Sequence, residues 1–410
     1  MWGWRRYADV VRGRLVLSES MDHFIDATLS DISRRGLIKK IHVLEGAAEP
    51  TVIVDGKRCI QLASNNYLGL TTHPKIRAAA IEAFSLFGAG AGAVMPITGT
   101  MTIHQECERS LAELKGTPAA LLMQSGYSAN VGTISGLLGP GDVVISDETN
   151  HASIIDGIRL SGADKKIYPH LDLNTLEQHL EDASGYAKCL VVTDSVFSME
   201  GDIAPLPEIA SLAQTYGAAL MVDDAHATGV LGKNGGGSVE HFDLQGRVDI
   251  QIGTLSKAIG AVGGFVAATK GVIELLRHKS RPFLFSSGLP PSVAASVKTA
   301  IDLIREEPWR RQKLWKNSNF FKNGLKDLGF HTGSSKTPIT PVVIGESNVA
   351  TEMSERLKGE GVLASAIVFP MVPELAARIR TIVMGTHSQE ELTDALGAFE
   401  RIGKDMGVIS

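Results

Sequence analysis

Polar side chains that could do chemistry follow a series of apolar runs in this 410-residue chain. One of them is Lys257, which stands beside small residues after the apolar run 250–252. A lysine at the end of a buried strand can lose its hydration shell and form a Schiff base. After another run, Asp223 is followed three residues later by His226. A carboxylate and an imidazole in that arrangement can pair with a pyridinium nitrogen and contact a ring substituent.

A third run, 119–123, leads into the turn Gln124-Ser125-Gly126-Tyr127. A small-residue turn that opens a helix offers free backbone N–H groups at a positive dipole end, which suits a phosphate. Two more runs end before His151 and before the stretch 193–198. An imine-forming lysine, a pyridinium partner and a phosphate turn are together what pyridoxal phosphate (PLP) requires. The sequence therefore predicts a PLP site.

The elements that must position these residues form an α/β layered domain. Between residues 67 and 305, nearly uninterrupted apolar runs of strand length alternate with helical segments, which is typical of a largely parallel sheet buried on both faces. Ligands bind such sheets outside the carboxyl ends of the strands, which is where the polar residues stand. Residues 1–66 are expected to form an N-terminal extension with a helix over 22–42 and small strands, and residues 306–410 a smaller α+β domain.

Composition and charge argue against several other classes of protein. The chain has 40 Lys and Arg against 45 Asp and Glu, with no basic run that would pair with nucleic-acid phosphates. Its three cysteines suit neither a disulfide framework nor a metal site, so we expect no metal and a reducing, cytoplasmic location. No apolar stretch reaches the length of a membrane span, and we reject a signal peptide. Because Met21 opens a better helical sequence, we assign no function to residues 1–20.

Two competing motifs fail their context tests. Residues 88–93 match a dinucleotide-binding fingerprint, G-x-G-x-x-A, but the preceding residues 76–87 are helical in pattern rather than a strand. The run His104-Gln105-Glu106-Cys107 comes nearest to a zinc site and lacks the spacing of one. Neither nicotinamide chemistry nor zinc hydrolysis is therefore expected.

With these motifs in hand, the chain resembles the α-oxoamine synthases, PLP enzymes that condense a small amino acid with an acyl-CoA thioester. The likeness runs from about Met21 to the C-terminus. It implies the type I PLP-dependent transferase fold, with a mostly parallel seven-stranded sheet, and a homodimer whose active site lies at the subunit interface. Its markers are Asn65–Leu70, Asn150–Ser153, Val196–Met199, Asp223–His226, Thr254–Lys257 and Arg378–Thr381.

The resemblance implies roles for four catalytic residues. Lys257 would hold PLP through a Schiff base and later take the Cα proton of the amino acid. Asp223 would pair with the ring nitrogen, and His151 would stack on the ring. His226 would bond the ring oxygen and tune the imine.

It also implies the remaining contacts to cofactor and substrate. Ser198 would bond the ring oxygen as well, and Asn65 and Arg380 would hold the substrate carboxylate, for which a planar guanidinium is suited. The phosphate would be bound by one group of residues, helped by a serine from the partner subunit. This group consists of Ser125, Gly126, Tyr127 and Thr254, with Ser286 or Ser287 from the partner.

Within the family the sequence favours glycine C-acetyltransferase, which joins glycine to acetyl-CoA. The segments 150–160, 246–250 and 281–286 are closer to that enzyme, and Met371 stands where the biotin-pathway enzymes often have Thr. The alternatives are 8-amino-7-oxononanoate synthase, which uses L-alanine and pimeloyl-CoA, and a broad-specificity synthase. A serine palmitoyltransferase-like activity is less favoured.

Met95 departs from the family pattern, since many relatives carry a basic residue there. With Pro96 following, the local backbone is also constrained. This departure bears on the choice of acyl chain more than on the cofactor chemistry. A cofactor-binding partner subunit without activity is disfavoured because Lys257, which such proteins usually lose, is present.

Overall fold

The structure is a computed structural model that describes residues 19–34, 38 and 41–410. The chain divides into two compact units, residues 1–43 and residues 44–410, and each is described by itself.

In the first unit, helix α2 (Glu19–Arg34) covers the first part of the helix predicted over 22–42, but residues 38, 41 and 42 are not helical, so the prediction extends too far. The predicted positions 35–37, 39 and 40 lie outside the described residues, as do residues 1–18. Across the described part of the chain, no helix is both long enough and apolar enough to cross a membrane.

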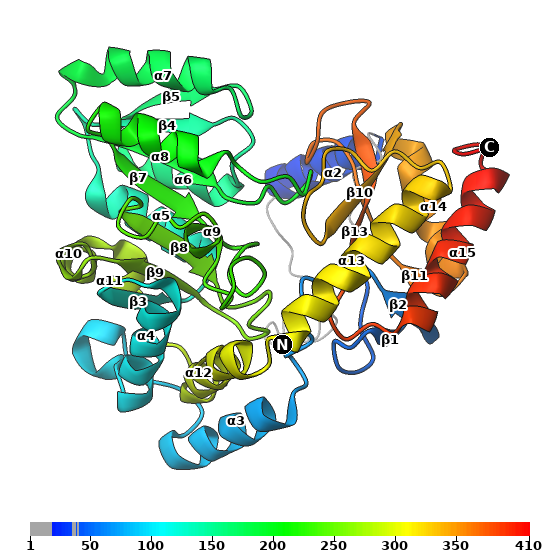
Figure 1. Ribbon diagram of the computed structural model, residues 1–410, viewed down its shortest axis with the longest axis horizontal. Helices are drawn as coiled ribbons and strands as arrows, with labels where there is room; N and C mark the ends of the chain where they lie inside the picture. The colour runs from blue at the N-terminus through cyan, green and yellow to red at the C-terminus, as the bar shows by residue number, and fades with distance from the viewer. Residues whose placement is uncertain (1–18, 35–37, 39–40) are drawn as a thin grey trace, which may run out of the picture. The chain divides into compact units, whose positions relative to one another are not determined.

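The second unit contains a seven-stranded sheet in the order β3-β9-β8-β7-β6-β4-β5, which runs from bottom to top in Figure 1. Strand β9 runs antiparallel to both of its neighbours, β3 and β8, and the other neighbouring strands of this sheet pair in parallel. The mostly parallel sheet expected from the sequence is thus confirmed. Its strands are β3 (Ala119–Met123), β4 (Val143–Asp147), β5 (Asp164–Tyr168), β6 (Cys189–Asp194), β7 (Ala219–Asp223), β8 (Ile250–Thr254) and β9 (Gly264–Ala268).

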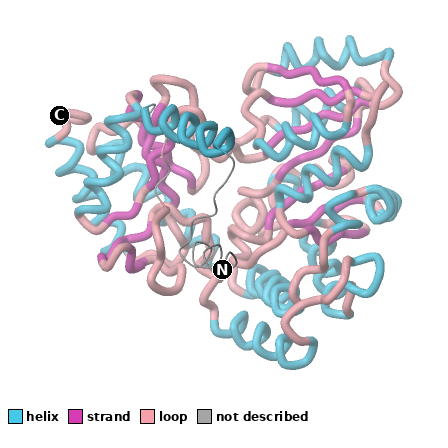
Figure 2. Tube along the Cα trace, turned by 180° about the vertical axis from the view of Figure 1, so that it is seen from behind, coloured by secondary structure: helices cyan, strands magenta, loops and turns pink. Residues whose placement is uncertain are grey.

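Helices cover both faces of this sheet because successive strand residues point to opposite sides and both sets are apolar. Val144 packs with Ile134 and Ile154 on one face. Its neighbour Val143 packs with Leu176 and Leu206 on the other. Figure 2 shows these helices in cyan around the magenta strands. The helices and turns of this region are α3 (Pro74–Phe87), η1 (Met95–Gly99), α4 (Thr102–Lys115), α5 (Gly126–Leu137), α6 (Ala152–Ser161), α7 (Leu173–Glu181), η2 (Asp182–Gly185), α8 (Leu206–Thr215), α9 (Ser238–His241), α10 (Lys270–Lys279), α11 (Arg281–Phe285) and α12 (Pro291–Glu306).

Strand β5 lies at one edge of the sheet and is absent from the sequence prediction. Its sequence, Asp-Lys-Lys-Ile-Tyr, leaves most of its side chains exposed, and Lys166 pairs with Asp182. Charged side chains protect an edge strand from pairing with other chains, but they also remove the apolar pattern by which a buried strand is recognised.

The C-terminal part is α+β, as the sequence predicts. The helices of this part pack against a three-stranded sheet with the strand order β10-β13-β12. Its elements are α13 (Trp309–Asp327), β10 (Ile339–Gly345), α14 (Ser347–Gly359), β12 (Ser365–Ile367), β13 (Ala377–Ile382) and α15 (Gln389–Asp405).

A second small sheet contains the small strands expected in the N-terminal part. Strands β1 (Thr51–Val54) and β2 (Lys57–Gln61) pair antiparallel, and β11 (Val362–Leu363) joins β2. The two turn residues, Asp55 and Gly56, both have positive φ (52° and 73°), as a tight two-residue hairpin requires.

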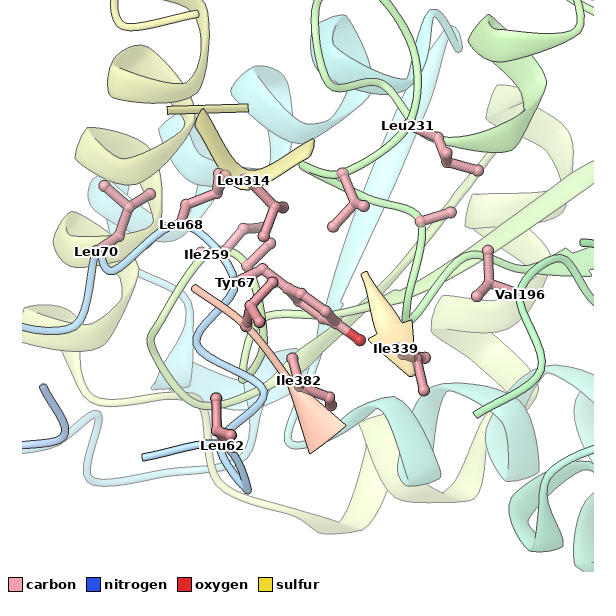
Figure 3. Packing of buried hydrophobic residues seen from close by; sticks show 14 of the residues in the cluster. Leu62, Tyr67, Leu68, Leu70, Val196, Leu231, Ile259, Leu314, Ile339 and Ile382 are labelled. Atoms are coloured by element: carbon pink, nitrogen blue, oxygen red, sulfur yellow. The ribbon is translucent and has the colours of Figure 1, made fainter. Parts of the chain in front are cut away.

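One continuous core joins the large sheet to the C-terminal sheet. It includes Phe265 of β9, Ile339 of β10 and Ile382 of β13, and Tyr67 is completely enclosed within it. Figure 3 shows Tyr67 in this core, with its hydroxyl directed away from Leu68 and Leu70. The domain boundaries at residues 66 and 305 stay a prediction.

Candidate active site

The site is assembled where parallel strands of the large sheet end. Asp194, Asp223 and Thr254 are the last residues of β6, β7 and β8, and Asp194 and Asp223 face each other in the strand register. Because parallel strands end at the same edge, residues far apart in sequence meet there.

Lys257 lies against His226 at the centre of the site, 2.8 Å from Nζ to Nε2. The other ring nitrogen of His226, Nδ1, is 2.7 Å from the Tyr67 hydroxyl. Burial, Lys257, Arg380 and His151 together hold the pKa of His226 well below its ordinary value, so the ring is neutral. Burial, aided by Arg380 and opposed by Asp223 and Asp194, lowers the pKa of Lys257 to about 8. About a tenth of the amine is therefore neutral at pH 7, far more than for an ordinary lysine.

A chain of hydrogen bonds connects Asp223 to His151. The Asn130 amide donates to Asp223 Oδ2 (2.6 Å) and to Ser153 Oγ (2.9 Å). The Ser153 hydroxyl lies 2.7 Å from His151 Nδ1. Asp194 accepts a hydrogen bond from the His151 backbone N–H (3.0 Å). The carboxylate and the imidazole are thus held in a fixed relation by two side chains that the sequence analysis does not single out.

Asp194 is buried beside Asp223, and burial together with that like charge raises the pKa of its carboxyl well above the ordinary value. Burial also lowers the pKa of His151, with Lys257 acting in the same direction and Asp223 against it. We expect His151 to be neutral and able to lie against a flat ring.

The turn Ser125-Gly126-Tyr127 forms the N-terminus of helix α5. Ser125 caps the helix, with its Oγ accepting from Ser128 N (2.9 Å). Among the described residues, the N–H groups of Gly126 and Tyr127 have no acceptor, so they are available to an anion. Thr254 is directly opposite, since a Cβ on Gly126 would lie 3.1 Å from the Thr254 Cβ.

Arg380 and Asn65 are brought together at the other side of Lys257. Arg380 Nη2 donates to Asn65 Oδ1 (3.2 Å), and its buried Nε has no acceptor in the described residues. Burial lowers the pKa of this guanidinium, which has no carboxylate partner within the described part of the chain. A buried cation left without an anion is suited to a substrate carboxylate.

Three predicted residues make no side-chain contact with this group. Ser198 lies in the loop after β6, and no side-chain hydrogen bond of it is present among the described residues. The Ser287 carbonyl accepts from the Gln124 amide (2.8 Å), next to the phosphate turn of the same chain. Whether Ser286 or Ser287 reaches a partner's site stays a prediction.

Tyr67, Asn130, Ser153 and Asp194 are site residues that the sequence analysis missed. Tyr67 lies within the family marker Asn65–Leu70, but the resemblance assigns it no role. Asn130 is a buried amide on helix α5, 1% exposed, and a buried polar side chain of this kind needs partners, which is the signal that could have identified it.

PLP fits the residues that are present. The amine of Lys257, the carboxylate of Asp223 and the N–H groups of Gly126 and Tyr127 are the three kinds of partner that its aldehyde, ring nitrogen and phosphate need. The backbone also leaves space for the phosphate turn, because a Cβ on Gly264 would come within 2.3 Å of Ser125 and the glycine avoids this clash.

Comparison with known proteins agrees with this fit. Residues 57–399 match the family described as aminotransferase class I and II. The 8-amino-7-oxononanoate synthase of Thermoanaerobacter pseudethanolicus is 54% identical over 387 residues, covering 94% of this chain and 98% of that protein. The 8-amino-7-oxononanoate synthase 1 of Bacillus subtilis is 50% identical over 386 residues, covering 94% and 98%.

Solved structures of two named enzymes are also similar to this chain. A serine palmitoyltransferase from S. paucimobilis with bound PLP–myriocin has a TM-score of 0.90 at 34% identity, over 97% of this chain and all of that one. The 8-amino-7-oxononanoate synthase of Francisella tularensis has a TM-score of 0.73 at 26% identity, over 85% and 98%.

The chain belongs to the aminotransferase class I and II family, and within it to the α-oxoamine synthases. It is a PLP-dependent acyltransferase with the type I transferase fold, as the resemblance predicts.

The preference for glycine C-acetyltransferase is wrong. Relatives that are about half identical over nearly the whole chain are named 8-amino-7-oxononanoate synthases, which supports the alternative. The physical reason is that a segment such as 150–160 carries His151 and Ser153, which belong to the candidate cofactor site, so its sequence reports on cofactor binding rather than on the choice of acyl group.

Proposed function

We propose that this enzyme is an 8-amino-7-oxononanoate synthase. It joins the Cα of L-alanine to the carbonyl carbon of pimeloyl-CoA, breaks the C–S bond to release CoA, and loses the alanine carboxylate as CO₂. The observation that carries the proposal is the near-full-length similarity to enzymes of that name, together with a complete set of site residues.

The chain's own residues each have a task in this reaction. Arg380 and Asn65 bind the alanine carboxylate, and burial strengthens that ion pair because water no longer screens it. The neutral Lys257 amine takes the Cα proton at Nζ, beside the neutral His226. Bound PLP supplies an electron-withdrawing ring that stabilises negative charge at Cα.

Asp223 keeps a proton on the nitrogen of that ring, and it can do so because Asn130 fixes its orientation. Asn130 donates to one carboxylate oxygen, Oδ2, while the Ala225 N–H donates to the other, Oδ1, at 2.8 Å. Two donors, one on each oxygen, fix the orientation of this carboxylate.

We also propose that the enzyme works as a homodimer with the active site at the subunit interface. Large apolar side chains are exposed next to the site, including Phe285 on α11 (69%) and Ile97 on η1 (76%). These two elements are neighbours, and Val94 pairs with Ser287 between them. Exposed apolar side chains that gather in one region mark an interface. The three cysteines are free, which supports a cytoplasmic location.

The test is CoA release by the PLP-loaded protein across a grid of substrates. Glycine, L-alanine and L-serine are each combined with acetyl-, pimeloyl- and palmitoyl-CoA, and free thiol is measured over time. The proposal predicts a maximum of kcat/KM at L-alanine with pimeloyl-CoA. A maximum at any other combination would contradict it.

A further inference from the structure

His170 bridges two buried aspartates close to the active site, and none of the three has a role in the reaction as described. Its Nδ1 lies 3.1 Å from Asp147 Oδ1, and its Nε2 lies 2.9 Å from Asp202 Oδ2. Asp147 and Asp202 are only 2% and 6% exposed. The edge of the ring packs on Phe197, with centroids 4.4 Å apart. Nδ1 also lies 2.7 Å from the Thr149 hydroxyl. Each ring nitrogen is within hydrogen-bond distance of a carboxylate oxygen, so a ring that is protonated at both nitrogens can donate to both aspartates and carries a positive charge.

The charge on this ring is consistent with its surroundings. Burial by itself lowers the pKa of His170, but the hydrogen bonds and negative charges of Asp147 and Asp202 outweigh it and raise the pKa to about 10. The bridge is therefore intact at neutral pH.

On one side, Asp147 builds the turn that leads to His151. Its Oδ1 accepts from the N–H and the hydroxyl of Thr149 (2.8 and 2.6 Å). One residue after Thr149, the Asn150 amide donates to Val192 O at 2.9 Å, which attaches the turn to β6. The position of His151 thus depends on Asp147.

On the other side, Asp202 closes the loop that carries Ser198. The Phe197 N–H donates to Asp202 O (3.2 Å), the Gly201 N–H donates to Phe197 O (2.8 Å), and Val196 pairs with Ile203. The loop 196–203 is therefore closed by its own backbone contacts, and its position depends on that of Asp202.

The same loop is attached to the C-terminal sheet. Gly201 O accepts from Lys336 N (3.0 Å) and from the Thr337 hydroxyl (2.9 Å). Arg378 donates to Met199 O (3.1 Å) and to Glu200 Oε1 (2.8 Å). Arg378 lies on β13, two residues before Arg380.

We propose that His170 is a positioning residue. By bridging Asp147 and Asp202, it fixes the turn of His151 relative to the loop of Ser198, and through that loop it aligns Arg380 for the amino-acid substrate. This inference rests on the proposed function, in which the site binds a small amino acid by its carboxylate. His170 itself does not touch the reacting atoms.

The test compares His170→Gln with His179→Gln. Glutamine can donate from its single amide nitrogen, so it cannot span both carboxylates. His179 is half-buried on the adjacent helix α7, where its one side-chain hydrogen bond within the described residues is to the Ile167 carbonyl (3.2 Å), and it serves as the matched control. Each PLP-loaded protein is titrated with L-alanine in the absence of any thioester, and the absorbance of the bound PLP is followed. This midpoint does not depend on how much of the sample is folded.

We expect the dissociation constant for L-alanine to rise about tenfold in His170→Gln, as a small misplacement of binding groups would cause, and to stay unchanged in His179→Gln. An unchanged constant in His170→Gln would overturn the proposal. Glycine and L-serine are titrated in parallel. If the wild-type protein binds one of these more tightly, the proposed substrate is contradicted, and the same comparison made with that amino acid still decides the role of His170.

A second variant separates positioning from simple stabilisation. In His170→Gln, Asp202 keeps a buried charge without its cation, which costs folding stability. The double variant His170→Gln/Asp202→Asn removes that charge. We expect the double variant to regain melting temperature while its dissociation constant for L-alanine stays high. Recovery of both quantities together would mean that His170 acts only on stability and would overturn the proposal.

Discussion

At the scale of single residues, the amine of Lys257 is the group on which the chemistry depends. Burial and the positive charge of Arg380 lower the pKa of this amine, while the negative charges of Asp223 and Asp194 act in the opposite direction. The neutral His226 next to it adds no charge. The site therefore holds a lysine that is a base and a nucleophile near neutral pH.

Replacing Lys257 by alanine should abolish turnover. The remaining contacts to PLP, from Asp223 and from the turn at Gly126, are untouched, so the variant should still bind PLP without a covalent bond. Thiol release measures the first expectation, and borohydride, which fixes PLP only when an imine exists, measures the second. Near-normal turnover in this variant would contradict the assigned role.

The lowered pKa of Lys257 makes attachment of PLP to the cofactor-free protein depend on pH. Because only the neutral amine attacks the aldehyde, the rate should rise with pH through about 8 and level off above it. Rapid mixing followed by absorbance measures this rate, and the Lys257→Ala protein provides the background from other lysines.

The pH dependence of PLP attachment should also change when Arg380 is replaced. Arg380 lowers the pKa of Lys257, so Arg380→Gln should raise that pKa and move the midpoint to higher pH. A midpoint that stays in place, or moves to lower pH, would show that Arg380 does not act on the amine.

Site residues could be predicted from the sequence where they directly follow a buried strand, as Asp223 and Lys257 do. Asn130 and Tyr67 could not be found in this way, because neither directly follows a strand of the large sheet. Asn130 is on a helix, and Tyr67 is in the core between the two sheets. Their roles follow only from contacts between distant parts of the chain.

At the scale of elements, the phosphate turn is held by the close packing of α5 on β9. Gly264 opens β9 and lies directly against the backbone of Ser125. The strands themselves are predictable because their residues are buried on both faces. The exception is β5, whose charged edge position hides it.

Gly264→Ala tests this packing. The added Cβ would come within 2.3 Å of Ser125, so the turn must move. We expect the free energy of unfolding to fall by about 1–3 kcal/mol and the dissociation constant of PLP to rise. Urea unfolding and a PLP titration measure the two effects. As a control, Gly271→Ala on α10 meets nothing within 4 Å and should leave PLP binding unchanged. Equal PLP affinity in both variants would contradict the role of Gly264.

At the scale of the whole molecule, the comparisons bear on what the motifs leave open. The motifs predict PLP and the amino-acid carboxylate, while the near-full-length relatives support the proposed acyl substrate. Assembly is likewise a property of the surface and is open to a direct test.

Phe285→Glu should weaken the proposed homodimer, because it places a charge among exposed apolar side chains. Sedimentation should show a shift towards monomer, and thiol release per chain should fall on dilution. Ile167→Glu on the edge strand β5 is the control, since Ile167 is also exposed (44%) but lies at the opposite edge of the sheet from β3. Dissociation of both variants to the same degree, or of neither, would count against an interface at Phe285.

The order of strands in the large sheet has a consequence for biosynthesis. Strand β3, which leads into the phosphate turn, pairs only with β9, whose residues follow it in the chain by more than one hundred positions. A ribosome must therefore deliver residue 268 before the turn at Gly126 gains its backing strand, and residue 380 before the carboxylate site is complete. Strand pairings between such distant segments form slowly. Binding of PLP by this polypeptide is accordingly a late event, which follows the synthesis of nearly the whole chain.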